Sequence, residues 1–380
     1  MGYKPNHIVL TTIDNATVLN DYYANLLIND ELESAKVWII GDKKTPSDIY
    51  NLAKELTNNG LETVYLDIEY QDNWGRRYPD FYNLVPYNDD CRRNIGYLHA
   101  LECGCERLIS IDSDNYPTND DFVNYHSQTG KNINRFLLSD TSGFYNICEL
   151  LNFKPSRHIF PRGYPFSLRD TDCDIYSSSR QVFVKIGVTA GLWLSDPDID
   201  SITWLNGKVK SVSYFGFDLS ILSQNTWTPI NSQNTSIARE LIPAFAFVPM
   251  GWIVPGGRIG RYGDILAGYF LQAIIQGTDY HVAFGRPLVE HRRNSHNYLK
   301  DLYQEYWGML ISDYLVMLLR EDFVPKEESI CNRVIELSEF LASKAIEKLP
   351  SWSTPEIKGF MMNTSKSLKL WANVCNDIIS

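Results

Sequence analysis

Ile109-Ser110-Ile111-Asp112-Ser113-Asp114-Asn115 is the stretch that decides the fold. The apolar run that begins at Leu108 has the length of a buried strand bounded by polar turn residues. It ends in two carboxylates one residue apart, and open α/β sheets bind their ligands at the carboxyl ends of strands. Two carboxylates at that edge suit a hard divalent cation and through it a diphosphate. The alternative is that both aspartates are turn or helix-capping residues, which bond nearby backbone N–H groups.

The chain has 380 residues, enough for one large domain or two. Its formal net charge of −11 argues against a general nucleic-acid binder. The seven cysteines are scattered and form no zinc pattern, which favours reduced thiols in a cytoplasmic protein. We expect no secretion signal and no membrane span, because no run of about 18 apolar residues occurs.

The first 130 residues alternate between strand and helix patterns. Strands are predicted at 7–12, 36–42, 63–66 and 108–111. Helices are predicted at 21–32, 47–58 (with Ser47 as N-cap) and 90–102. This alternation predicts an α/β fold with a mainly parallel sheet flanked by helices. Thr11 and Asp42 lie at the ends of the first two strands and are candidates for contact with a ligand.

The pattern changes twice further along. Short segments rich in Tyr and Trp follow from about 135 to 255, with strands predicted at 182–188 and 211–215. After about 297 the chain is predicted to be helical. We therefore expect a catalytic domain over 1–296, with a donor half at about 1–130 and a sugar or acceptor half at about 131–296. A helical subdomain over 297–380 would serve packing or oligomer contacts.

Two basic segments are candidates for binding phosphate. Arg92 and Arg93 begin a helix, whose N-terminal end favours phosphate; salt bridges to Asp89 and Asp90 are the alternative. The segment from Arg162 to Arg169 is rich in Pro and Gly and presents two arginines. Their planar guanidinium groups match phosphate or carboxylate oxygens. A fixed surface loop is the alternative there.

Three further positions carry chemistry. Gly191 would allow a ligand close to the backbone, whereas the nearby Asp198 and Asp200 are expected to be turn residues. Asp264 lies in the first turn of an apolar helix, either as a helix-terminal charge or as a base facing a sugar. His291 follows a strand-like run and is a candidate to complete an Asp-based metal site, although a single His is more often structural.

In chain order, these segments resemble the reversibly glycosylated polypeptides, or UDP-arabinopyranose mutases, over about residues 85–300. The resemblance rests on Cys91-Arg92 with Gly96-Tyr97, Ile111 to Asp114, the block Arg162 to Arg169, Gly191 to Leu194 with Pro197, Asp198 and Asp200, Ile259 to Gly268, and His291. It implies a GT-A-type glycosyltransferase fold. It also implies a nucleotide-sugar donor, with a UDP-sugar favoured, and complexes that include a homo-oligomer.

The resemblance also assigns roles. Asp112 and Asp114 would hold Mn²⁺ or Mg²⁺ against the donor diphosphate, with His291 as third ligand. Arg162 falls on the family's reversibly glycosylated arginine, Arg169 on a second functional arginine, and Asp264 on an acidic motif that faces the sugar. The residues expected to contact the donor are Thr11, Asp42, Arg92, Arg93, Gly96, Asp112, Gly191 and Trp193. Because a charged guanidinium is a poor nucleophile, the simpler expectation for Arg162 is hydrogen bonding to the diphosphate.

The chain also departs from the family. Ser113 replaces the middle one of three successive aspartates in the family. Gly263 replaces one of the two aspartates of the acidic motif that contains Asp264. The segment from about 205 to 258 does not match the family well. Three hypotheses follow. The first is a UDP-sugar mutase that cleaves the anomeric C–O bond. The second is a glycosyltransferase that moves the sugar to a glycan acceptor. The third is a non-catalytic subunit that binds nucleotide-sugars.

Overall fold

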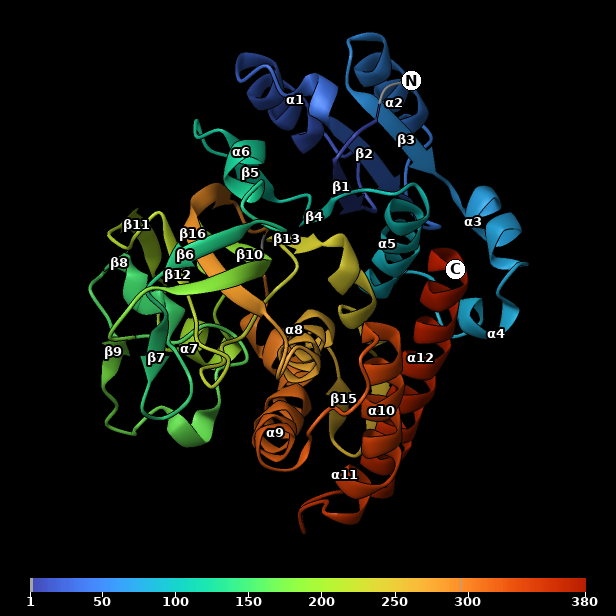
Figure 1. Ribbon diagram of the computed structural model, residues 1–380. Helices are drawn as coiled ribbons and strands as arrows, with labels where there is room; N and C mark the ends of the chain where they lie inside the picture. The colour runs from blue at the N-terminus through green and yellow to red at the C-terminus, as the bar shows by residue number, and fades with distance from the viewer. Residues whose placement is uncertain (1–2, 295) are drawn as a thin grey trace.

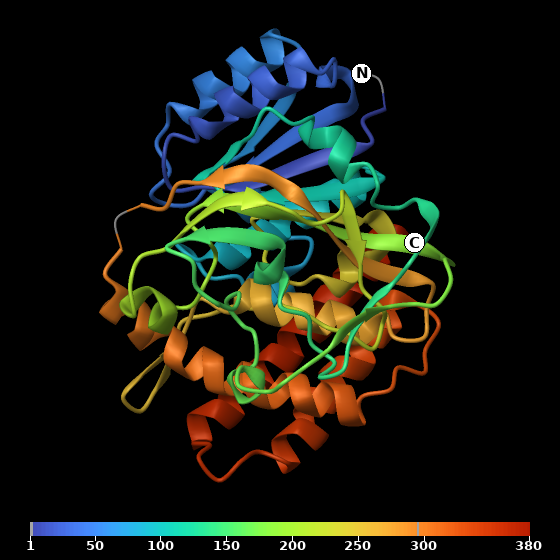
Figure 2. The same ribbon diagram turned by 90° about the vertical axis from the view of Figure 1, so that its left-hand side faces the viewer.

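The computed structural model describes residues 3–294 and 296–380. Its centre is a twelve-stranded sheet whose main path runs β12-β16-β10-β13-β4-β1-β2-β3. Helices cover both faces of this sheet (Figure 1). Seen from the side in Figure 2, α1 and α2 lie above it, and the C-terminal helices lie below it. The predicted α/β class, with flanking helices and a helical C-terminal region, is confirmed.

The first half of the sheet is parallel, as predicted. It consists of β1 (Asn6–Thr11), β2 (Ala35–Ile40), β3 (Glu62–Leu66) and β4 (Arg107–Ile111). The helices between them are α1 (Val18–Ile28), α2 (Ile49–Asn58), α3 (Ile68–Gly75), α4 (Pro79–Tyr82) and α5 (Arg93–Glu102). Every residue of β4 is buried, which explains its apolar run. The prediction of Ser47 as N-cap is wrong: α2 begins at Ile49, after Asp48.

The second half of the sheet is mixed in direction. It contains β10 (Val182–Ser195), β12 (Leu219–Ile221), β13 (Asn234–Ala238) and β16 (Tyr280–His291). β13 is antiparallel to both β4 and β10, so the strand direction changes at the middle of the sheet. β16 then runs parallel to β10. β10 extends the predicted strand at 182–188 by seven residues, because its whole central part is covered on both faces.

Sequence patterns missed β13 because its buried side chains are polar. The side-chain oxygen of Asn234 accepts from Nε2 of His126 at 2.9 Å, and the Thr235 hydroxyl donates to the carbonyl of Asn231 at 2.8 Å. Such bonds remove the cost of burying polar groups. A hydrophobic period cannot reveal a strand of this kind.

The smaller elements frame the sheet. They are β5 (Asn115–Pro117), α6 (Phe122–His126), β6 (Asn132–Arg135), β7 (Leu138–Asp140), β8 (Leu151–Lys154), β9 (Ile175–Ser177), α7 (Ser201–Leu205), β11 (Lys210–Tyr214), β14 (Trp252–Val254) and β15 (Gly257–Ile259). β11 confirms the strand predicted at 211–215. β5 directly follows the acidic stretch and pairs with the end of β16, which brings Asn115 opposite His291.

The C-terminal helices share one continuous hydrophobic core with the sheet. They are α8 (Gly263–Ile274), α9 (Tyr298–Asp322), α10 (Ile330–Ala342), α11 (Lys344–Glu347) and α12 (Pro355–Ile379). Trp371 of α12 donates its indole N–H to the carbonyl of Pro243 at 2.8 Å and packs on Phe81. Within the described ranges, none of the helices has the length and apolarity that crossing a membrane requires.

Candidate active site

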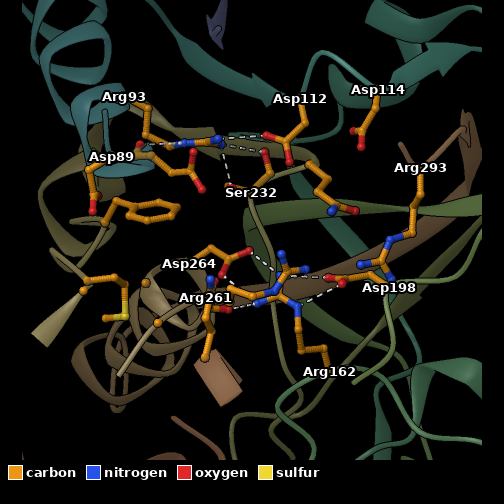
Figure 3. Close-up of a pocket in the computed structure, with 18 of the residues that line it drawn as sticks. Asp89, Arg93, Asp112, Asp114, Arg162, Asp198, Ser232, Arg261, Asp264 and Arg293 are labelled. Carbon is orange, nitrogen blue, oxygen red and sulfur yellow. Dashed lines mark hydrogen bonds and ion pairs between the residues drawn. The ribbon is translucent and has the colours of Figure 1, made fainter. Parts of the chain in front are cut away.

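A polar pocket of about 450 Å³ lies where β4 and β16 end. Its walls come from the start of α5, the loop after β4, and residues between 247 and 264. Single residues of other segments complete the lining: Arg162, Asp198, Ser232, Gln233, His291, Arg293, His296 and Gln304. Figure 3 shows acidic and basic side chains from these segments pointing toward one another. Six of the predicted site residues line this pocket: Arg93, Asp112, Asp114, Arg162, Asp264 and His291.

Asp112 is held by Arg93. One guanidinium nitrogen of Arg93 donates to the Asp112 carboxylate at 2.8 Å, and the other donates to the hydroxyls of Ser232 at 2.6 Å and Ser110 at 3.2 Å. Burial raises the pKa of Asp112, against the lowering effect of Arg93. Arg93 therefore forms an ion pair with the acidic motif itself instead of the salt bridge to Asp89 or Asp90 that was the alternative, and its contact with a phosphate stays a prediction.

Asp114 faces His291 instead. The Nδ1 atom of His291 lies 2.8 Å from the carbonyl of Asp196, which makes it the protonated nitrogen and leaves a lone pair on Nε2. That Nε2 lies 3.3 Å from the Asp114 carboxylate. Two acceptors facing each other fit a cation between them, either a proton or a metal ion. Burial would raise the pKa of Asp114, but a proton shared with Nε2 of His291 keeps it below the usual value.

The predicted three-residue metal site is not assembled. In the part of the chain that the structure describes, no three His, Cys, Asp or Glu side chains are grouped closely enough to hold a metal ion. Asp112 is turned to Arg93, so Asp114 and His291 alone have the donor atoms and the orientation that fit a divalent cation.

Arg162 lies between two buried carboxylates. Its Nε and one terminal nitrogen donate to Asp198 at 2.9 and 3.1 Å, and both terminal nitrogens donate to Asp264 at 2.9 and 3.1 Å (Figure 3). A further bond goes to the backbone carbonyl of Arg261. Because a guanidinium has five N–H donors, all of them are engaged. The expected hydrogen bonds from Arg162 to a diphosphate have no free donor in this arrangement.

The charges of Arg162 and its carboxylate partners shift one another's pKa toward the charged form. Burial alone would lower the pKa of the Arg162 guanidinium, but Asp198 and Asp264 hold it well above its usual value. Burial would likewise raise the pKa of Asp198, but its pairing with Arg162 lowers it to about 2. We call Arg162 with Asp198 and Asp264 the arginine clamp. Asp198, expected to be a turn residue, is one of its two anions.

The backbone conformation at Gly163 and Arg261 positions the groups of the arginine clamp. Gly163 has a φ of +88°, and a Cβ at this position would clash with Ile265. The Pro-Gly segment therefore fixes the path of the chain beside Arg162, as predicted. Arg261 has a φ of 58°, which is unfavourable for a side chain with a Cβ. This conformation directs its carbonyl toward Arg162, and the Nε of Arg261 donates to the buried Glu305 of α9 at 2.8 Å.

Arg169 lies outside the pocket lining. It donates to Asp200 at 2.7 Å and stacks on Phe166, with 3.6 Å between its guanidinium carbon and the ring centre. Asp200 also caps the N-terminus of α7 by accepting from the backbone N–H of Thr203 at 2.8 Å. Arg169 and Asp200 therefore stabilise the loop that carries Asp198, and a direct catalytic role for Arg169 stays a prediction.

Six residues predicted to contact the donor also lie outside this pocket lining: Thr11, Asp42, Arg92, Gly96, Gly191 and Trp193. Arg92 is fully buried and donates to Gln71. Gly96 allows close packing of α5 on Val9 and Ile40.

The other members of this group have local roles too. Asp42 accepts from the backbone N–H groups of Lys43 and Asn88 at 2.7 and 2.6 Å. Gly191 lies against the side chain of Asn234 and lines a second groove, and Trp193 is buried in the core. Contact of these residues with a donor stays a prediction.

Two arginines that sequence reasoning missed line the pocket with open donors. Arg258 Nε and one terminal nitrogen of Arg293 are buried without a hydrogen-bond partner in the described residues. Arg293 is oriented by Trp204, whose ring centre lies 5.3 Å from the guanidinium, and Trp204 stacks on Tyr298. The adjacency of Arg293 to His291 was a usable signal. Arg258 lies in the segment at about 205–258, where the resemblance to the family is weak, so no signal pointed to it.

An α/β sheet whose strand β4 ends in an acidic pair beside an arginine-lined pocket has its candidate site at the strand ends, where open α/β sheets bind ligands. The chain belongs to the reversibly glycosylated polypeptide family, whose model matches residues 67–374. It is 28% identical over 270 residues to UDP-arabinopyranose mutase 1 of Oryza sativa subsp. japonica, covering 70% of this chain and 67% of that protein. It is also 28% identical over 267 residues to UDP-arabinopyranose mutase 1 of Arabidopsis thaliana, covering 69% and 68%.

Among solved structures, S. aureus TarS 1–349 in complex with UDP-GlcNAc is similar over 99% of this chain and 91% of that chain. The TM-score is 0.42 and the identity 10%, a likeness too distant to carry an argument about substrate or mechanism.

Proposed function

We propose that this protein is a UDP-sugar mutase, which cleaves the anomeric C–O bond of its donor and interconverts pyranose and furanose forms of the sugar. The observation that carries the proposal is the arginine clamp beside Asp112 and Asp114 in one pocket. Membership of the family, and relatives named UDP-arabinopyranose mutase, support the same reaction class. The donor half at about 1–130 and the sugar half at about 131–296 would both contribute to this pocket.

Arg258 and Arg293 are the groups that we assign to the donor diphosphate. Their unpartnered N–H groups are strong donors for phosphate oxygens, and a buried donor needs an acceptor. A divalent cation held by Asp114 and His291 would supply further positive charge to the leaving diphosphate. The negative charge that develops as the anomeric bond breaks is thereby stabilised from two walls of the pocket.

We assign the arginine clamp to stabilising the sugar as its anomeric bond breaks. Bond cleavage places positive charge on the anomeric carbon and ring oxygen. Arg162 holds the Asp198 and Asp264 carboxylates in place and lowers the pKa of Asp198, so a negative charge is available to that carbon. The resemblance implies that Arg162 is glycosylated. This modification would require at least one of the five hydrogen bonds of its guanidinium to break.

The proposal is tested by incubating the purified protein with UDP-, GDP- and dTDP-sugars and Mn²⁺, without an acceptor. Products are separated by anion-exchange chromatography. A new nucleotide-sugar of unchanged mass is expected, in a yield that is lost in the Asp264→Asn variant. Every donor left intact, in the presence of measurable donor binding, would refute the mutase and favour the non-catalytic subunit.

A glycosyltransferase is the second candidate. The observation that favours it is the pocket wall formed by Phe247, Met250 and Arg258. This wall belongs to the segment at about 205–258 that departs from the family, so the ligand on that side is expected to differ. Release of free UDP that rises with an added glycan, and no isomer of the donor, would select the transferase.

A further inference from the structure

A histidine and an aspartate form a dyad at one end of the pocket, outside the roles assigned above. His296 lines the pocket, and its Nδ1 lies 2.9 Å from the Asp301 carboxylate in the first turn of α9. A carboxylate partner makes Nδ1 the protonated nitrogen, so Nε2 carries the lone pair. In the described residues, Nε2 makes no hydrogen bond with another side chain or backbone group. About a quarter of the His296 side chain (23%) is exposed, which leaves this lone pair accessible to a ligand.

The surrounding charges favour the neutral imidazole. Burial lowers the pKa of His296 first, and Arg293 and Arg261 lower it further, against the raising effect of Asp301. Arg293 comes from the segment after β16, Arg261 from the loop before α8, and Asp301 from α9. At neutral pH the imidazole is therefore able to accept a proton on Nε2 and to return it.

Interconversion of ring forms needs such a group. The diphosphate leaves the anomeric carbon and later returns to it. In between, the bond from this carbon to the ring oxygen breaks, and the same carbon forms a bond to a sugar hydroxyl oxygen. That hydroxyl loses its proton and the released ring oxygen gains one, so the reaction is balanced without a co-reactant. The carboxylates of the clamp cannot readily take this proton, because both are paired with Arg162. Asp112 is paired with Arg93.

We propose that His296, oriented by Asp301, is the proton-transfer residue of this pocket, a role that rests on the proposed function. Its Nε2 accepts the proton from the attacking hydroxyl and delivers it to the oxygen that leaves the ring. The Asp301 carboxylate stabilises the imidazolium in between. In a transfer to an external acceptor, the same atom would take the acceptor's hydroxyl proton.

The test compares His296→Asn and Asp301→Asn with His158→Asn, which changes an exposed histidine elsewhere. His296→Asn is expected to lower kcat about 100-fold or more, with KM changed less than threefold. His296→Ala should recover activity with added imidazole. Asp301→Asn should move the acidic limb of the kcat/KM profile to lower pH, because it removes the charge that raises the imidazole pKa. His158→Asn should leave both parameters unchanged. His296→Asn activity within twofold of wild type would overturn the proposal.

A second measurement does not depend on turnover. The ¹⁵N NMR signals of the His296 ring are expected to show an Nδ1–H tautomer, and the Nε2 signal should shift when a UDP-sugar is added but not when UDP alone is added. An Nε2 signal whose chemical shift does not change when a UDP-sugar binds would overturn the proposal. Absence of donor turnover in the wild type would refute the mutase, and the NMR result would still decide whether His296 contacts the sugar.

Discussion

Replacement of Arg162 by Ala tests the arginine clamp most directly. The change removes five hydrogen bonds and leaves Asp198 and Asp264, both buried, as neighbouring uncompensated charges. Removal of one partner from a buried ion pair costs about 3–5 kcal/mol of stability. We therefore expect this loss at pH 7 together with complete loss of turnover. Arg162→Lys keeps the charge without the planar fork and should lose less stability.

The loss of stability in the Arg162→Ala variant should depend on pH, whereas a simple packing defect would cost the same at every pH. In the wild type, the pKa of Asp198 is lowered from 3.8 to about 2, which contributes about 2 kcal/mol of stability. This contribution is complete above about pH 4 and is lost as the pH falls toward 2. Without Arg162, burial raises the pKa of Asp198 instead. Protonation then relieves the buried charge, so the stability deficit of the Ala variant should shrink as the pH falls from 7 to 4.5.

The assay is urea unfolding at pH 7 and pH 4.5, with Arg292→Ala as the control. Arg292 is 56% exposed, with an ion pair to Glu290 and a contact with the Tyr116 ring at the surface, so its loss should change stability by less than about 0.5 kcal/mol. An Arg162→Ala protein as stable as the wild type at pH 7 would refute the buried clamp. A deficit that is equal at both pH values would refute the electrostatic explanation for it.

Three further outcomes are expected. Asp114→Asn should weaken Mn²⁺-dependent UDP binding at least tenfold in titration calorimetry, as should EDTA treatment of the wild type; equal affinity with and without metal would remove the cation from this site. Arg258→Met and Arg293→Met should each weaken binding of UDP about 10- to 100-fold, because a charge-assisted hydrogen bond contributes about 1.5–3 kcal/mol; unchanged affinity would place the diphosphate elsewhere. Gly163→Ala should destabilise the protein by more than about 1 kcal/mol in urea unfolding, since the added Cβ meets Ile265 at a positive φ, and a neutral effect would contradict this geometry.

Long-range pairing explains what sequence reasoning missed at the site. Arg162, Asp198 and Asp264 were each visible as charged residues beside Gly or Pro. Asp198 and Asp264 lie 36 and 102 residues after Arg162 in the sequence. The three side chains meet only when β10 and α8 pack on the sheet. For the same reason, Arg92 and Arg93 were indistinguishable in sequence. One helix position turns Arg92 into the core against Gln71 and the next turns Arg93 toward Asp112.

The sequence by itself determined the features that depend on near neighbours. Runs of apolar residues set the parallel strands, Pro and Gly set the path at Arg162 to Arg169, and the order of motifs set the family. The tertiary structure alone decided which charges remain open to a ligand. Hydrogen bonding between distant segments occupies Arg162 and Asp112, while Arg258, Arg293 and His296 keep unpartnered atoms in the pocket. The antiparallel strand β13, whose buried polar side chains give no hydrophobic period, also brings Ser232 next to Arg93.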